Sequence, residues 1–196
     1  MLFRSLPHYV DRFYQAAGIL LLEGYGLTES GPILSVRRQA RPVFGTIGPI
    51  LRDVEYRVVG EDGSVLGPNH KGVLHVKSPQ IMLGYYKRPE ETAKVLQDGW
   101  LNTGDLAVFT HKGECKIVGR AKETIVLMGG ENIEPTPIEE TMVQSDYIEQ
   151  AMVVGQDQKF LGALIVPNLE KLEAAATAKG ITYVEKIGRA SCRERV

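Results

Sequence analysis

The spacing of hydrophobic residues changes twice along the chain, and each stretch has its own period. In residues 5–18 apolar side chains recur every three or four positions, which predicts an amphipathic helix. The short apolar run 19–22 predicts a strand, and it leads into a loop, residues 23–31, that contains three glycines. A strand directly before a glycine-rich turn is where α/β folds place ligand chemistry. The N-terminal part therefore predicts α/β structure with a candidate ligand site in residues 23–31.

Apolar and polar residues alternate with a period of two from about residue 43 to residue 118, which is typical of half-buried β-strands. The expected strands cover 53–58, 72–78, 106–109 and 115–118, and the last two form a hairpin. One helix interrupts them. It begins at Pro89, carries Glu90 and Glu91 in its first turn, and stops at Gly99. The middle of the chain therefore predicts a small, mostly antiparallel β unit.

Strands and helices follow in a new order in the last third of the chain: strand, helix, strand, strand, helix. The expected strands cover 124–127, 148–155 and 162–166. The first of these helices begins at a capping box, with Thr136 as the cap and Glu139 at the third position, and the second is capped by Asn168. This order predicts a compact α+β unit, and we place the domain boundary at residues 119–122.

The composition is that of an ordinary globular protein. Lysine and arginine total 23 against 24 aspartates and glutamates, so the net charge is −1, which argues against a dedicated nucleic-acid binder. The two cysteines, Cys115 and Cys192, are too few for a disulfide framework and lack the spacing of a zinc site. No apolar run approaches the roughly 18–20 residues of a membrane span, and the N-terminus has no signal-peptide pattern. We therefore expect a cytoplasmic protein, with a peripheral membrane contact left open.

Residues 186–196 follow none of these patterns. They carry four basic residues and one acidic residue, without a hydrophobic period. One interpretation is a solvated basic tail. We favour another, that the segment is foreign, because it resembles translated adapter or vector sequence at the end of a truncated reading frame.

Four short motifs that can carry chemistry follow one another along the chain. They are 23–30 (EGYGLTES), 84–90 (GYYKRPE), 98–105 (DGWLNTGD) and 119–139, which opens with GRAK and contains GGENIEP. Glycines on both sides of Tyr25 let the backbone approach a flat ligand. The hydroxyl and carboxylate of Thr28 and Glu29 can hold a phosphate oxygen and a hard cation such as Mg²⁺. Asp105 can accept two hydrogen bonds from a sugar diol, and Arg120 can donate to the same sugar.

Each motif taken alone also has an ordinary structural explanation. A Gly-x-Gly turn is more often only a turn, and Asp105 alone fits a carboxylate at the start of a strand. Arg120 and Lys122 alone are more often surface charges, and Tyr85 and Tyr86 more often pack than stack. The four histidines share no spacing, so we assign them no chemistry. The signal lies in the combination and order of the motifs.

Together and in this order, the motifs resemble those of the adenylate-forming, acyl-activating superfamily. This superfamily includes acyl-CoA synthetases, luciferases and peptide-synthetase adenylation domains, and the resemblance covers about residues 5–184. Bacterial long-chain fatty acid–CoA ligases are the members most similar in the segments 129–135, 147–150, 154–157 and 161–168. Acyl–acyl carrier protein synthetases look similar over the same stretch.

The resemblance implies a domain division. Residues 1–119 would be the end of the large AMP-binding domain, an α/β strand-and-loop segment followed by the small antiparallel β unit. Residues 120–185 would be a truncated, small α+β C-terminal domain, and 186–196 the foreign tail. The superfamily's upstream phosphate-binding loop and the lysine near its C-terminal end have no counterpart here. We therefore expect a fragment, with loose folding or poor solubility of residues 1–118 alone, which cooperative thermal unfolding of that piece would contradict.

The resemblance also implies which residues bind the nucleotide. Tyr25 would lie against adenine, with the backbone of the turn formed by Gly24 and Gly26 nearby. Thr28 would hydrogen-bond the α-phosphate. The ribose hydroxyls would bind to Asp105, with a second ribose contact from the arginine of the GRAK motif, Arg120.

Other residues would act in positioning and acyl transfer. Glu29 would help to position Mg²⁺. Lys122 would be the hinge about which the small domain turns between the two half-reactions. The loop of Gly129, Gly130 and Glu131 would face the thiol acceptor in the second half-reaction.

The implied reaction joins a fatty acid to a thiol. The carboxylate attacks the α-phosphate of ATP, giving acyl-AMP and pyrophosphate, and a thiol then attacks the mixed anhydride. Coenzyme A is the first expectation for the acceptor, and acyl carrier protein is the alternative. We expect the chain alone to be inactive. A non-enzymatic nucleotide-binding module and a truncated-gene artefact stay open as interpretations of a different class.

Overall fold

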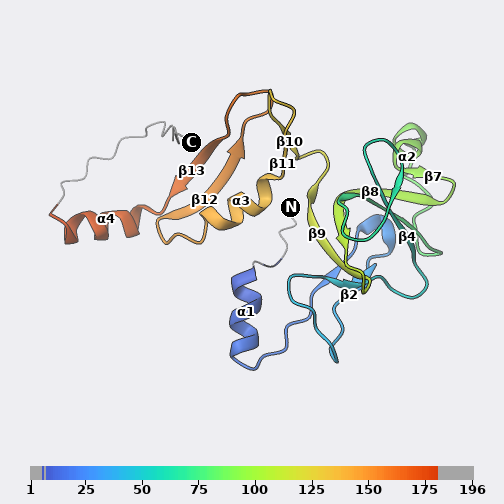
Figure 1. Cartoon of the computed structure of the whole chain (residues 1–196), viewed down its shortest axis with the longest axis horizontal. Helices are drawn as coiled ribbons and strands as arrows, with labels where there is room; N and C mark the ends of the chain where they lie inside the picture. Colours follow the sequence, from blue (N-terminus) through green and yellow to red (C-terminus); the bar gives the residue numbers. More distant parts are fainter. Residues whose placement is uncertain (1–5, 7, 181–196) are drawn as a thin grey trace. The chain divides into compact units, whose positions relative to one another are not determined.

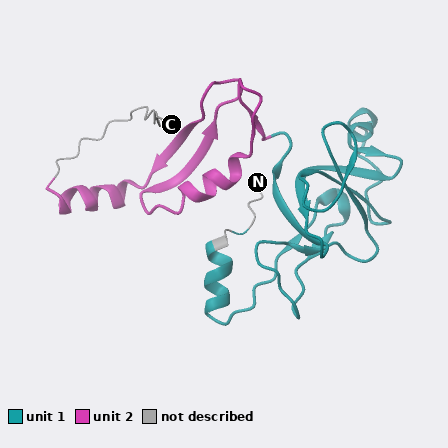
Figure 2. Cartoon of the chain, viewed as in Figure 1, with its two compact units in different colours: residues 1–122 teal, residues 123–196 magenta. Residues whose placement is uncertain are grey.

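The chain forms two compact units in the computed structural model, which describes residue 6 and residues 8–180 (Figure 1). The first unit comprises residues 1–122 and the second residues 123–196 (Figure 2). Both units combine helices with antiparallel sheets, which is the fold class that the sequence predicts. The expected foreign tail, 186–196, lies outside the described residues.

A helix and three short strands open the first unit. They are α1 (His8–Ala16), β1 (Gly24–Tyr25), β2 (Ser35–Val36) and β3 (Gly48–Pro49), with the 3₁₀ helix η1 (Thr28–Ser30) after β1. The strand predicted at 19–22 is wrong, because these residues form no strand. The chain leaves α1 through Gly18, whose φ is 73°, and the Ile19 N–H donates back to the Tyr14 carbonyl at 2.9 Å. An apolar run becomes a strand only where a neighbouring strand completes its hydrogen bonds, and the strand forms later, at β1.

A seven-stranded antiparallel sheet makes up the rest of the first unit. Besides β3, its strands are β4 (Glu55–Val59), β5 (Val65–Leu66), β6 (Gly72–Lys77), β7 (Leu96–Gln97), β8 (Trp100–Phe109) and β9 (Glu114–Arg120). Their order is β3-β9-β8-β6-β4-β5, with β7 beside β8. The strands predicted at 53–58 and 72–78 are confirmed to within two residues. The predicted hairpin is confirmed as β8 and β9, with longer arms than expected.

The hydrophobic core lies on one face of this sheet. Leu74 and Val76 of β6 are fully buried, as the period of two predicts, and they cluster with buried Val58 of β4 and Leu101 of β8. Burying side chains of this size stabilises the fold by about 1.5–3 kcal/mol each. The core therefore fixes the register of the central strands, and with it the positions of the polar residues between them.

The helix predicted after residue 88 is α2 (Pro89–Val95), and it is shorter than the sequence suggests. Pro89 opens it and two glutamates occupy its first turn, as predicted. The helix ends at Val95 rather than at Gly99, because the next two residues form β7 and pair with β8. Gly99, with a φ of 78°, lies in the turn between these strands.

The second unit has the predicted order of strand, helix, strand, strand, helix, with one more short strand before the first helix. Its elements are β10 (Ile125–Val126), β11 (Asn132–Ile133), α3 (Pro135–Met142), β12 (Ile148–Val154), β13 (Gly162–Pro167) and α4 (Leu169–Ala178). β10 pairs with β11, and β12 with β13, both antiparallel. The Asn168 cap is confirmed, since its side chain accepts from the Lys171 N–H at 3.1 Å.

The capping box predicted at Thr136 is wrong. α3 already begins at Pro135, with Glu134 in the cap position and no side-chain cap bond. Proline has a fixed φ that suits the first helical position, so the helix starts one residue before the expected cap. Glu139 bonds elsewhere, because its Oε1 accepts from the Val153 N–H at 2.8 Å and ties α3 to β12.

Candidate functional site

Three of the predicted site residues meet at one carboxylate. The Tyr25 hydroxyl donates to Asp105 Oδ2 at 2.6 Å, and Arg120 Nε lies 3.1 Å from Asp105 Oδ1. Asp105 is 4% exposed, and the register of β8 and β9 pairs it with Arg120. Tyr25 and Asp105 are 80 positions apart in the sequence, so it is the fold that joins the first, third and fourth motifs. We call these three residues the Asp105 cluster.

A bulge in β8 directs the Asp105 side chain toward Tyr25 and Arg120. Three β8 residues, 103–105, stand opposite Leu74 alone in β6. Thr103 Oγ1 donates to the Leu74 carbonyl at 2.8 Å and accepts from the Asp105 N–H at 3.1 Å. Gly104 allows the bulge, because its φ of 72° lies in the left-handed region. Bulges of this kind re-aim side chains next to functional sites.

The Tyr25 hydroxyl stays protonated in this environment. Burial raises its pKa well above the usual range, and the negative charge of Asp105 raises it further. The hydroxyl is therefore a donor to Asp105 at any physiological pH. A carboxylate offers about four lone-pair sites, so Asp105 can still accept from a vicinal diol after its contacts with Tyr25 and Arg120.

Thr28 and Glu29 lie in η1. The segment is closed by Ser30, whose Oγ accepts from the Leu27 N–H and donates to the Leu27 carbonyl, both at 3.0 Å. Glu29 Oε1 accepts from the Tyr85 hydroxyl at 2.8 Å. Burial, followed by this hydrogen bond and the charge of Glu29, raises the pKa of Tyr85. The fold thus joins the second motif to the first.

The two glycines beside Tyr25 differ in what surrounds them. A Cβ at Gly26 would lie 1.5 Å from the Pro32 carbonyl oxygen, so packing against the chain itself requires glycine there. A Cβ at Gly24 would meet its nearest atom, the Ser35 carbonyl oxygen, at 3.4 Å. Gly26 is therefore required by packing against the segment that follows η1, and the predicted approach of this turn to a flat ligand stays a prediction.

The remaining predicted residues lie at the end of the first unit and in the second. Lys122 is exposed and is the last residue of the first unit. Gly129, Gly130 and Glu131 are exposed in the turn between β10 and β11. Gly130 has a φ of 86°, and its N–H donates to the Leu127 carbonyl at 2.9 Å. These loop residues and the Asp105 cluster belong to different units.

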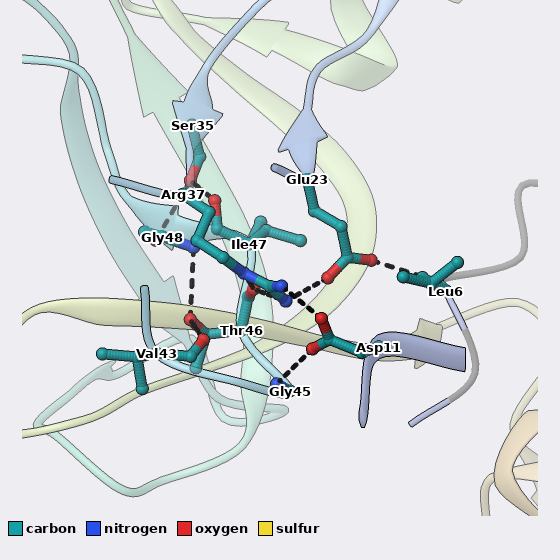
Figure 3. Close-up of polar contacts among 10 residues, drawn as sticks. All are labelled: Leu6, Asp11, Glu23, Ser35, Arg37, Val43, Gly45, Thr46, Ile47 and Gly48. Atoms are coloured by element: carbon teal, nitrogen blue, oxygen red, sulfur yellow. Dashed lines mark hydrogen bonds and ion pairs between the residues drawn. The ribbon is translucent and has the colours of Figure 1, made fainter. Parts of the chain in front are cut away.

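The sequence pattern missed a buried ionic cluster beside the first motif (Figure 3). Arg37 is 1% exposed; its Nη1 donates to Asp11 Oδ1 at 2.8 Å and its Nη2 donates to Glu23 Oε2. Nε and Nη2 also donate to the Thr46 carbonyl, at 3.0 and 2.7 Å. The cluster ties α1 to the residue that precedes β1. We call Asp11, Glu23 and Arg37 the Arg37 cluster. No hydrophobic period or motif in the sequence indicates it.

Glu29 is the carboxylate of η1 that could bind a divalent cation. Within residues 8–180, no three histidine, cysteine, aspartate or glutamate side chains form a group that could hold a metal ion. Proteins commonly bind Mg²⁺ through one or two carboxylates together with substrate phosphates and water, and Glu29 fits that mode. No helix in the described part of the chain is long and apolar enough to cross a membrane.

Two family descriptions match the chain, one in each unit. "AMP-binding enzyme" matches residues 4–86, and "AMP-binding enzyme C-terminal domain" matches residues 122–190. The chain belongs to the AMP-binding enzymes. Asp105 and Arg120 lie between the two matched segments, and the second match includes the first five residues of the expected foreign tail.

Curated AMP-binding relatives include proteins named for fatty acid activation. A long-chain-fatty-acid–[acyl-carrier-protein] ligase of Arabidopsis thaliana is 42% identical over 92% of this chain. A long-chain-fatty-acid–CoA ligase of Salmonella typhimurium is 36% identical over 85% of it. A third relative, "Probable acyl-activating enzyme 16" of Arabidopsis thaliana, is 45% identical over 89%. The chain spans about a quarter to a third of these proteins, at 27%, 30% and 26% of their lengths.

Solved structures of AMP-binding enzymes share the fold. The ATP-bound RpMatB–BxBclM chimera has a TM-score of 0.75 and 29% identity, over 85% of this chain and 34% of the chimera. O-succinylbenzoate coenzyme A synthetase from Bacillus subtilis, in complex with ATP and magnesium, has a TM-score of 0.74 and 26% identity, over 83% and 35%.

Proposed function

We propose that the chain supplies the ribose- and adenine-binding part of an ATP-dependent, AMP-forming acid–thiol ligase. The observation that carries this proposal is the Asp105 cluster, in which Tyr25, Asp105 and Arg120 from three separate motifs meet at one buried carboxylate. A buried carboxylate with spare acceptor sites, a flat aromatic ring and a half-exposed arginine suit a nucleoside. The family matches and the ATP-bound neighbours support the same ligand class.

Each side chain has a defined part in nucleotide binding. Asp105 accepts from the ribose hydroxyls, and Arg120 donates to the same sugar. The ring of Tyr25 lies against adenine while its hydroxyl holds Asp105 in place. Thr28 donates to the α-phosphate, and Glu29 helps to hold Mg²⁺, which offsets the charge that grows on the phosphate in the transition state.

The second unit serves the acyl transfer. We assign residues 1–119 to the end of the large AMP-binding domain and 120–185 to the small C-terminal domain. Lys122 is the hinge between them, and its place at the unit boundary and at the start of the C-terminal family match supports this. The exposed turn of Gly129, Gly130 and Glu131 faces the thiol.

The whole protein activates long-chain fatty acids. A fatty carboxylate attacks the α-phosphate of ATP, and a thiol then takes the acyl group from AMP. Relatives named for coenzyme A and for acyl carrier protein both match most of the chain, so coenzyme A is our first acceptor and acyl carrier protein the second. Acyl transfer by the full-length parent to each thiol separates these two. The chain itself, at 26–30% of the length of these relatives, does not complete the reaction.

Calorimetric titration of the chain with AMP tests the proposal. We expect saturable binding that Asp105→Asn weakens about tenfold or more, because the amide cannot accept as strongly from two hydroxyls. Lys116→Gln, which removes an exposed charge elsewhere on β9, should leave the affinity unchanged. Equal affinity of the wild type and Asp105→Asn would contradict the proposed site. ATP–pyrophosphate exchange by the chain alone should be absent, and measurable exchange would overturn its proposed inactivity.

A further inference from the structure

The face of the sheet opposite the core carries basic residues in register. β6 alternates buried Leu74 and Val76 with half-buried His75 and Lys77. Arg57 of β4 stands opposite His75. Adjacent strands place such neighbours about 5 Å apart, so three basic side chains share one small area.

Trp100 lies at the centre of this area. The Arg57 guanidinium carbon is 4.3 Å from the centre of the indole ring, and Lys77 Nζ is 5.9 Å from it. The Lys77 stem packs along the turn before β8, where a Cβ at Gly99 would lie 3.2 Å from its Cε. We call Arg57, His75, Lys77 and Trp100 the Trp100 cluster.

The cluster has donors without protein acceptors. Arg57 Nε is buried and has no hydrogen-bond partner. Among the residues that the structure describes, no carboxylate forms an ion pair with Arg57 or Lys77; Glu55, which stands opposite Lys77 in the register, is exposed and forms none with it. A buried donor left unpaired is destabilising, and two cations at one ring repel each other. An oxyanion in this area would offset the repulsion between the two cations.

The pKa of His75 also reflects the positive charge in this area. Burial lowers the pKa of His75, and the positive charge of Arg57 lowers it further. An anion bound between these side chains would reverse the second effect.

We propose that the Trp100 cluster is a binding site for a phosphate group. A phosphate monoester carries a charge of about −1.5 to −2 at pH 7, which matches the two full positive charges of Arg57 and Lys77. The planar guanidinium donates two parallel hydrogen bonds to phosphate oxygens, and the ammonium adds a point charge. The site uses none of the residues of the Asp105 cluster, so it goes beyond the proposed function and does not depend on it.

Intrinsic fluorescence reads this site directly, because Trp100 is the only tryptophan in the chain. The chain is titrated with inorganic phosphate, and in a second arm with coenzyme A, at an ionic strength held constant with sodium chloride. We expect a saturable change in Trp100 emission. A much lower half-saturation concentration for coenzyme A identifies the phosphate of a larger ligand, and similar values identify the free ion; both support the site.

Four variants separate this site from general charge effects. Arg57→Gln and Lys77→Gln should each weaken phosphate binding about tenfold. Lys112→Gln, which changes an exposed lysine in the β8–β9 turn, and Lys116→Gln, which changes an exposed lysine of β9, should each bind as the wild type does. Thermal unfolding of each variant confirms that it is folded. The proposal is overturned if neither ligand changes the emission, if Arg57→Gln and Lys77→Gln both titrate like the wild type, or if Lys112→Gln and Lys116→Gln weaken binding as much as they do.

Discussion

Among the described residues, the two units differ in how many apolar side chains they bury. In the first unit, ten buried side chains form one cluster on the sheet. In the described part of the second unit, the buried apolar residues are Ile125, Pro135, Ala151 and Val153. Met152 and Leu164, paired in register on β12 and β13, are 58% and 63% exposed. A dense core lets the first unit hold side chains in fixed positions, whereas the second presents its candidate residues on an exposed turn.

The two units also differ in their buried ionic interactions. The Arg37 cluster places two carboxylates and one guanidinium inside the first unit. In the second unit, the Glu139 carboxylate of α3 accepts from a backbone N–H of β12. Desolvated ion pairs add little net stability while they are intact, but they are costly to break. The first unit should therefore be far more sensitive to a single substitution.

The largest effect should come from Arg37→Met. This change removes the cation from buried Asp11 and partly buried Glu23, which should reduce the free energy of unfolding by about 3–5 kcal/mol. Urea denaturation followed by Trp100 emission measures it, because that fluorophore lies in the first unit. Arg37→Lys is the matched control: it keeps the charge, and a smaller loss is expected. A loss below about 1 kcal/mol for Arg37→Met would mean that the cluster does not hold the first unit together.

The next effect compares the two cores. Leu74→Ala removes a fully buried side chain from the first unit and should cost about 2–5 kcal/mol. Val153→Ala in the second unit should cost about 1–2 kcal/mol, because fewer methyl groups are lost and fewer neighbours surround them. Hydrogen exchange resolved by residue measures each unit separately. Equal losses of unfolding free energy in the two variants would contradict the proposed difference in core density.

The smallest effect is a change in how steeply the free energy of unfolding falls as the pH rises. The pKa of Tyr25 is raised above its usual 10.0, so its stabilising contribution is complete below pH 10. The contribution is lost as the pH rises further, because the unfolded chain releases the proton first. Tyr25→Phe should therefore lose stability less steeply than the wild type above pH 10, as measured by urea midpoints at successive pH values. Tyr85 and Cys115, whose pKa values burial also raises, remain in both proteins. Parallel slopes would show that the Tyr25 hydroxyl is not coupled to folding.

Local patterns predicted the elements whose partners are close in sequence. The alternation in 72–78 and the turn at 111–113 give the strand and the hairpin that the structure contains. The prediction at 19–22 failed because an apolar run does not reveal whether a second strand lies beside it. Thr136 and Glu139 match a capping box by spacing, yet Glu139 bonds a backbone N–H of β12, 14 positions later.

The site depended on contacts that no local pattern contains. Tyr25 and Asp105 were selected from motifs through a family resemblance, while their hydrogen bond and the bulge that aims Asp105 came from the fold. Arg37 was missed because an arginine in a polar stretch is typical of the surface. Trp100 lies inside the third motif, but only the register of β4, β6 and β8 places the basic residues around it.

The central claim is that Asp105 recognises the ribose hydroxyls of a nucleotide. The most direct measurement compares the affinity of the chain for AMP with its affinity for 2′,3′-dideoxy-AMP, which lacks both hydroxyls. The account predicts that the wild type prefers AMP by about tenfold or more, and that Asp105→Asn binds the two ligands nearly equally. Equal affinities in the wild type, or a preference that survives Asp105→Asn, would contradict it.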